Sequence, residues 1–202
     1  MKRISLILVA VALCGLTIGV LSPSRRVWAF SEKEHHFVGA AGGENEYNKG
    51  RAPEDWWSEI EHMHGHVGPW NVLGWRVGQA ALREFNTKWG LHELDIICYV
   101  PLKTPYSCIA DGLVIGTGNT IGRLDLRLAE VVSLDFVQVC VRRKDGEGPI
   151  LTFRPKLTYL KHIDAPKLEE LEKLSRQCSR MPEDSLFEVT RIIPSEHKST
   201  EP

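Results

Sequence analysis

Residues 71–86 read NVLGWRVGQAALREFN, and this stretch determines how the rest of the chain is interpreted. Its apolar residues recur at roughly helical spacing: Val72, Trp75, Val77, Ala81, Leu82 and Phe85. Gly74, Gly78 and Ala81 place small residues along one side. Because a glycine inside a helix costs about 1 kcal/mol relative to alanine, these glycines predict very close packing against a neighbouring element. The stretch therefore predicts a central, glycine-containing helix.

The residues around this helix predict a mixture of helices and strands. A helix is expected to begin after residues 53–55 (PED) and to break near Gly65. Residues 95–102 (DIICYVPL) are nearly continuously apolar, which is typical of a strand covered on both faces. Further strands are expected near residues 124–128, 137–139, 150–157 and 186–193, with a hairpin-type turn at 145–149 and helices at 107–115 and 165–180.

This order of elements favours an α+β fold, because strand runs are adjacent in sequence rather than alternating regularly with helices. We expect a single domain in which a mixed or antiparallel sheet is packed by the glycine-containing central helix and by a C-terminal amphipathic helix. The chain has 202 residues, a length that favours one sizeable domain.

Composition and charge exclude several classes of protein. Hydrophobic residues make up 43% and charged residues 25%, so the chain is neither wholly disordered nor fibrous. The 25 basic and 26 acidic residues nearly balance, and without a basic excess we expect no nucleic-acid partner. Five cysteines in a chain of this length do not indicate a disulfide framework.

The N-terminus has the features of an export signal. Lys2 and Arg3 precede an apolar run over residues 4–21, and Val27-Trp28-Ala29 fits the pattern for cleavage after Ala29. The run is also just long enough for a transmembrane helix, so an uncleaved anchor is the alternative. Either way we expect an exported protein, periplasmic or on the outer face of the cytoplasmic membrane. The membrane is a partner only if the segment is not cleaved.

Composition divides the chain into four parts. Residues 1–29 are the signal peptide or anchor, and the polar, Gly-rich residues 30–52 predict a flexible lead-in. The patterned helices and strands fall within residues 53–195, the predicted domain, and residues 196–202 predict a disordered tail.

The densest group of chemically active residues is HMHGHVGP, residues 62–69. Histidine is the commonest metal ligand, and His64 and His66 point the same way if the backbone between them is extended. Gly65 permits a tight backbone there, and Pro69 suits the first turn of the following helix. The pattern predicts a metal site, and the alternative is a solvent-exposed His-rich loop without a ligand.

A second group lies at residues 105–112, PYSCIADG. Cys108 precedes Asp111 by three residues, so on a helical turn the thiol and the carboxylate share one face. A thiolate completes a mixed His/Cys site suited to zinc or another late transition metal. The alternative is that Cys108 is a small buried hydrophobic residue and that Asp111 caps the following turn.

A third group, GTGNTIG at residues 116–122, has the glycine content of a loop that approaches a ligand closely. Asn119 and Thr120 offer polar contacts, but a plain turn is the alternative. The loop lacks the lysine of a phosphate-binding loop and does not match the dinucleotide fingerprint, so we expect no nucleotide cofactor.

In this order, the three groups resemble the FmdE family, which is named after a component of formylmethanofuran dehydrogenase. The family pattern His-Gly-His-x-Cys-Pro reads HGHVGP at 64–69, and Leu-Gly-x-Arg reads LGWR at 73–76. Cys-x-x-Asp-Gly reads CIADG at 108–112, and Thr-Gly-Cys-Thr-x-Gly-Lys reads TGNTIGR at 117–123. Two family cysteines are therefore replaced, by Gly68 and Asn119, and the family lysine by Arg123. This sequence also has none of the Cys-x-x-Cys pairs that form a C-terminal zinc ribbon in many members.

The resemblance implies an α+β domain that holds zinc or another divalent transition metal. The expected metal ligands are His64, His66 and Cys108, with Asp111. The residues expected to contact a substrate or to support the ligands are His62, Thr117, Asn119, Thr120 and Arg123. Expected export separates this chain from a cytoplasmic formylmethanofuran dehydrogenase, whose redox chemistry belongs to other subunits.

Three functional hypotheses follow. The first is an exported metal-binding protein. The second is a non-metal interaction domain, a homodimer in which the Gly74/Gly78 helix packs against a second copy. The third is an enzyme in which a metal activates water or substrate while Asp111 or His62 handles protons, although no residue pattern names a reaction.

Overall fold

The central helix forms where the sequence predicts it. The computed structural model describes residues 51–194, and in it α2 runs from Pro69 to Glu84. Gly68 is the N-cap and Pro69 occupies the first turn, where its missing N–H costs nothing. Most of the predicted apolar stripe is buried: Val72 and Val77 are fully inaccessible to solvent, whereas Trp75 is half-buried.

Two shorter helices carry the residues of chemical interest. Helix α1 spans Trp56–His64, and Asp55 caps its N-terminus by accepting a hydrogen bond from the Trp57 backbone N–H at 3.0 Å. It ends at Gly65, whose φ of 87° lies in the left-handed region that glycine favours. Helix α3 spans Ile109–Thr117, after a single 3-10 turn at Tyr106–Cys108.

Five strands form one mixed sheet in the order β2-β1-β3-β4-β5. The strands are β1 (Leu94–Val100), β2 (Leu126–Glu130), β3 (Gln138–Arg143), β4 (Ile150–Pro155) and β5 (Phe187–Ile192). β1 and β2 are parallel and are joined through α3, whereas the other neighbouring strands are antiparallel. The expected α+β fold with a mixed sheet is confirmed.

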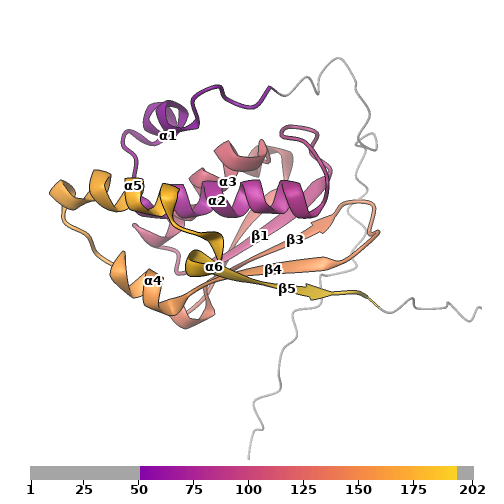
Figure 1. Cartoon of the computed structure of the whole chain (residues 1–202). Coiled ribbons are helices and arrows are strands. Elements are labelled where there is room, and N and C mark those ends of the chain that lie inside the picture. The colour runs from indigo at the N-terminus through magenta and orange to yellow at the C-terminus, as the bar shows by residue number, and fades with distance from the viewer. Residues whose placement is uncertain (1–50, 195–202) are drawn as a thin grey trace, which may run out of the picture. The chain divides into compact units, whose positions relative to one another are not determined.

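The helices cover one side of the sheet. Figure 1 shows α2, α3 and α5 (Leu171–Arg180) on the same side, with α1 beyond α3. Ile96 and Cys98 of β1 are fully buried beneath them, whereas Ile97 and Tyr99, which point to the opposite face, are only half-buried. The second face of β1 is therefore covered less completely than expected, with Asp95 buried and Ile97 and Tyr99 only partly so.

The C-terminal half differs from the sequence expectation in its helices. Residues 157–162 form a helix, α4 (Leu157–His162), that the sequence pattern assigned in part to the preceding strand. Helix α5 begins at Leu171 rather than near residue 165. The backbone before it is extended at Lys167 and then forms a 3-10 turn at Leu168–Glu170. A single turn, α6 (Glu183–Leu186), precedes β5.

The glycines of α2 face another helix of the same chain. A Cβ added at Gly74 would overlap the Ile109 carbonyl oxygen of α3, and one added at Gly112 of α3 would overlap the Asn71 carbonyl oxygen of α2. The backbones of α2 and α3 are therefore in direct contact. The close packing predicted from the glycines is confirmed, but its partner is α3 and not a second copy.

The predictions for the two ends of the chain lie outside the described residues. These are the signal peptide or anchor at 1–29, nearly all of the lead-in at 30–52, and the tail at 196–202. Within residues 51–194, no helix combines the length and the apolar character needed to cross a membrane.

Candidate functional site

The contact between His64 and Asp111 joins two elements 47 residues apart. His64 is the last residue of α1 and Asp111 lies in the first turn of α3, and 2.7 Å separates His64 Nδ1 from Asp111 Oδ2. An ionised carboxylate only accepts hydrogen bonds, so Nδ1 carries the proton and donates it. In the neutral ring the lone pair is then on Nε2, the ring atom left available for a ligand.

The helix ends favour this pair electrostatically. The N-terminus of a helix carries partial positive charge and the C-terminus partial negative charge. Asp111 sits at the N-terminal end of α3, and His64 sits at the C-terminal end of α1. The His64 side chain is 15% exposed and the Asp111 side chain 42%, so the pair lies at the surface with one side open to solvent.

The second histidine lies beside the first. The ring centroids of His64 and His66 are 4.7 Å apart and their planes are tilted by 51°. The sequence pattern places both rings on one side only if the backbone between them is extended. The backbone is not extended, because Gly65 has a φ of 87° in the left-handed region. Partial burial lowers the pKa of His66, and the His64 imidazole lowers it further. A lowered pKa keeps this ring neutral, the form that ligates metals.

Cys108 lies one helical turn before the same carboxylate. It is the N-cap residue of α3 and it is half-buried. Burial raises the pKa of the Cys108 thiol, and the negative charge of Asp111 raises it further. Cys108 has helical backbone angles and Asp111 lies three residues on in the first turn, which is the spacing that the predicted shared face requires. The thiol is protonated near neutral pH, so binding a metal would release its proton.

Sequence reasoning missed Asn71, which connects the two halves of this region. Its side chain is fully buried in the first turn of α2. Oδ1 accepts a hydrogen bond from the Gly68 N–H at 2.9 Å, and Nδ2 donates one to the Cys108 carbonyl at 3.1 Å. Only its polarity within an otherwise apolar helix face distinguishes Asn71 in the sequence.

This region lies within the part of the chain that matches a known family. The family model described as FmdE, Molybdenum formylmethanofuran dehydrogenase operon, matches residues 63–188, well over half of the chain. The chain belongs to the FmdE family. The matched residues include both histidines, Cys108 and Asp111. No curated protein matches the chain.

The loop residues of the FmdE pattern lie at the opposite end of α3. Helix α3 separates Cys108 from Asn119, and at a rise of about 1.5 Å per residue its length is roughly 14 Å. The side chains of Thr117 and Asn119 are buried: the Thr117 hydroxyl donates to the Leu113 carbonyl, and Asn119 Nδ2 donates to the Leu94 carbonyl at 2.7 Å.

Thr120 and Arg123 belong to this far end as well. Thr120 caps the 3-10 turn at Ile121–Arg123, accepting a hydrogen bond from the Arg123 N–H. The Arg123 guanidinium lies 3.9 Å from the carboxylate of Asp125. The structure therefore does not bring these four residues to His64 and His66: Thr117, Asn119, Thr120 and Arg123. His62 is exposed on α1, and a two-residue step of about 200° around the helix turns it away from His64.

The donor set of this FmdE-family protein fits a metal in part. Two imidazoles lie side by side, and a carboxylate orients one of them in the way that metal-binding histidines are commonly held. Across residues 51–194, however, no three side chains of His, Cys, Asp or Glu are arranged to hold an ion. The metal-ligand roles of His64, His66, Cys108 and Asp111 stay predictions.

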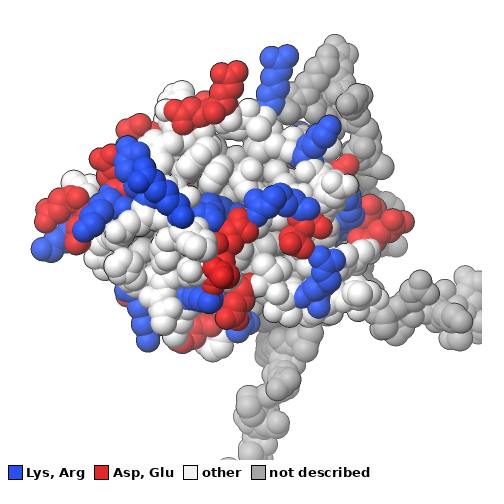
Figure 2. All heavy atoms as spheres, viewed as in Figure 1, with Lys and Arg blue, Asp and Glu red and all other residues white. Residues whose placement is uncertain are grey.

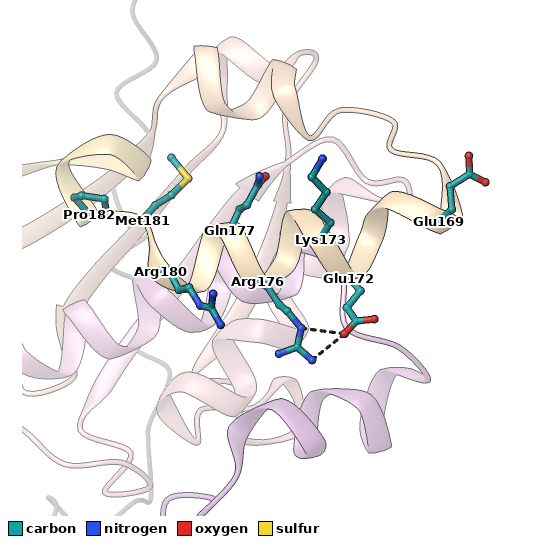
Figure 3. A pocket seen from close by; sticks show the side chains of 8 residues that line it. All are labelled: Glu169, Glu172, Lys173, Arg176, Gln177, Arg180, Met181 and Pro182. Carbon is teal, nitrogen blue, oxygen red and sulfur yellow. Dashed lines mark hydrogen bonds and ion pairs between the residues drawn. The ribbon is translucent and has the colours of Figure 1, made fainter.

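A shallow hollow runs along α5, outside the motifs of the FmdE pattern. Figure 3 shows its lining, which comes from α5 and its two ends: Glu169, Glu172, Lys173, Arg176, Gln177, Arg180, Met181 and Pro182. Arg176 pairs with Glu172 at 2.8 Å and lies over the ring of Trp57. Figure 2 shows acidic and basic side chains interspersed on this face, so the hollow has no single charge that would select a ligand.

Proposed function

We propose that this FmdE-family protein is an exported metal-binding protein that holds zinc or another divalent transition metal. His64 and His66 supply the imidazole ligands, Cys108 is the soft third ligand, and Asp111 fixes the ring of His64. The observation that carries the proposal is the 2.7 Å contact between His64 Nδ1 and Asp111 Oδ2, with the His66 ring 4.7 Å from that of His64.

The chemistry of the donors supports zinc or a similar ion. Zinc is bound by imidazole nitrogen, thiolate sulfur and carboxylate oxygen, usually with four ligands. Two imidazoles and one thiolate would leave one position for water. A bound ion of this kind acts as a Lewis acid, and in this protein the residue beside it that could accept a proton is Asp111. No reaction is assigned.

The sequence features of the first 29 residues support export. The basic start, the apolar run at 4–21 and the cleavage pattern ending at Ala29 predict a periplasmic protein, or one held on the outer face of the cytoplasmic membrane. The name of the family refers to a formylmethanofuran dehydrogenase operon. Export would separate this member from a cytoplasmic complex, so we propose metal holding as its role.

Metal content tests this function. The full-length protein, produced without a histidine tag, should carry nearly one ion per chain by elemental mass spectrometry. His64→Gln and Cys108→Ser should each lower metal affinity by about tenfold or more if both residues ligate. His62→Gln is the matched control, because it removes an exposed histidine from the same helix and should leave the metal content unchanged.

Three results would contradict the proposal. If His62→Gln removes as much metal as His64→Gln, binding belongs to the exposed histidine tract and not to the proposed site. If neither His64→Gln nor Cys108→Ser changes affinity, the ligand assignment is wrong. A wild-type protein that stays folded and cannot be loaded with metal would leave the non-metal interaction domain as the better hypothesis.

A further inference from the structure

The side chain of Asn71 bridges the turn that carries the histidines and the turn that carries Cys108. On one side its Oδ1 accepts from the N–H of Gly68, two residues after His66. On the other side its Nδ2 donates to the carbonyl of Cys108 itself. Both hydrogen bonds are of ordinary length, and both partners are backbone groups.

The chemistry of the side chain matches this bridging role. A carboxamide holds a donor and an acceptor on one rigid plane, so it satisfies an N–H and a C=O at the same time. A carboxylate of the same shape lacks the donor and would face the Cys108 carbonyl with a negative charge. A shorter hydroxyl side chain could not span both partners. Asparagine is therefore suited to setting the distance between the two turns.

The surroundings prevent Asn71 from adjusting. Its side chain is 0% exposed, and its own carbonyl oxygen lies against Gly112, the residue after Asp111, so closely that no Cβ would fit between them. The backbone of Asn71 therefore fixes the position of α3, and its side chain fixes the residue that precedes α3. The positions of the histidine turn and of the Cys108 turn therefore both depend on Asn71.

We propose that Asn71 is the positioning residue of the candidate metal site. Its two hydrogen bonds fix the separation between the histidine turn and the Cys108 turn, the two segments that carry the expected ligands. This inference rests on the proposed function for its metal readout. It goes beyond that function by naming a residue that does not touch the ion and whose replacement should still weaken binding.

The test measures the Zn²⁺ affinity of full-length variants by competition with a chromophoric chelator. Asn71→Asp keeps the shape and removes the donor, and Asn71→Ser shortens the side chain without burying a charge, in case the first variant does not fold. The matched control is Asn119→Asp, because Asn119 is a buried amide that also donates to backbone carbonyls, but at the far end of α3.

We expect both Asn71 variants to bind Zn²⁺ about tenfold or more weakly, as replacement of residues that orient metal ligands commonly does. Asn119→Asp should lose stability and keep its affinity. Wild-type affinity in the folded Asn71 variants would overturn the inference. An equal loss in Asn119→Asp would also overturn it, since the effect would then follow general destabilisation.

Two metal-free measurements separate this inference from the proposed function. The first is the NMR signal of the His64 ring proton that is donated to Asp111, and the second is the rate of Cys108 alkylation. If the wild type binds no Zn²⁺, the proposed function fails. Movement of both readouts in the Asn71 variants but not in Asn119→Asp would still establish the positioning role, and no movement would overturn it.

Discussion

An aspartate contacts a histidine near each end of α3, yet only one of the two carboxylates is open to solvent. At the N-terminal end, Asp111 is 42% exposed and makes a close contact to His64. Beyond the C-terminal end, Asp125 is fully buried and contacts His92 and Lys144, each at 3.1 Å, and the N–H of Thr120 at 2.7 Å.

The difference teaches which of the sequence motifs can carry chemistry. A fully buried carboxylate that already accepts from several donors is inaccessible to a ligand from solvent, and it serves to hold the loop before β2 against the sheet. The exposed carboxylate of Asp111 orients the ring of His64 and leaves the other ring nitrogen available. We therefore expect substitutions at the Asp125 end to change stability and substitutions at the Asp111 end to change binding.

The largest effect should come from Asp125→Asn. Removing one partner of a buried ion pair costs about 3–5 kcal/mol, because the remaining charges lose their compensation. We expect a loss of stability of this size in urea denaturation, with metal content per folded chain unchanged. A loss close to zero would show that this cluster does not anchor the loop, and the contrast between the two ends would fail.

The second-largest loss of stability should come from a substitution that disturbs the contact between α2 and α3. In Gly112→Ala, the added Cβ would overlap the Asn71 carbonyl oxygen, and such overpacking costs about 1–3 kcal/mol, even though alanine is the better helix former. The matched control is Gly122→Ala, where nothing lies within 4 Å of the added carbon. Denaturation midpoints of the two variants compare them. Equal midpoints would contradict direct backbone contact between these helices.

The pH dependence of stability sharpens the comparison at His92. Burial lowers the pKa of His92 from its ordinary 6.5, and the positive charges of Arg123 and Lys144 lower it further, whereas Asp125 acts in the opposite direction. The unfolded chain therefore binds the proton more readily. The contribution of His92 to the free energy of unfolding is fully present above pH 6.5. It is lost as the pH falls through that value toward the lower pKa of the folded protein.

His92→Asn provides the measurement. Asparagine tolerates the positive φ of 56° at this position and can still donate to Asp125. We expect the free energy of unfolding of the wild type to fall more steeply below pH 6.5 than that of the variant. If the free energy of unfolding depends on pH in the same way in both proteins, the pH dependence comes from groups other than His92.

The smallest change in stability should come from Asp111→Asn. An exposed ion pair contributes about 0–1 kcal/mol, and the amide oxygen can still accept the His64 ring proton. Metal affinity should nevertheless fall by about tenfold, because the orienting charge is lost. Isothermal titration with Zn²⁺ alongside urea denaturation measures both quantities. A large stability loss with unchanged affinity would reverse the roles assigned to the two aspartates.

Local sequence signals located most elements to within a few residues. The α2 stripe, the start of α1 after Asp55 and the turn before β4 depend on neighbouring residues, so they were predictable. The start of α5 was not, because the charged pattern of a helix continues through the 3-10 turn at Leu168–Glu170. Helix α4 is only six residues long, too short for its periodicity to be distinguished from that of the strand before it.

The sequence by itself determined the fold class, the family and the residues that could bind a metal, because these follow from periodicity and from motifs in a fixed order. Only the tertiary structure decided which motifs meet. It placed Asp111 against His64, turned the glycines of α2 toward α3, used Asn119 to anchor a loop, and made the buried Asn71 a link between two turns. Those outcomes depend on which backbone groups need a hydrogen-bond partner once the helices are packed, and no local pattern records that requirement.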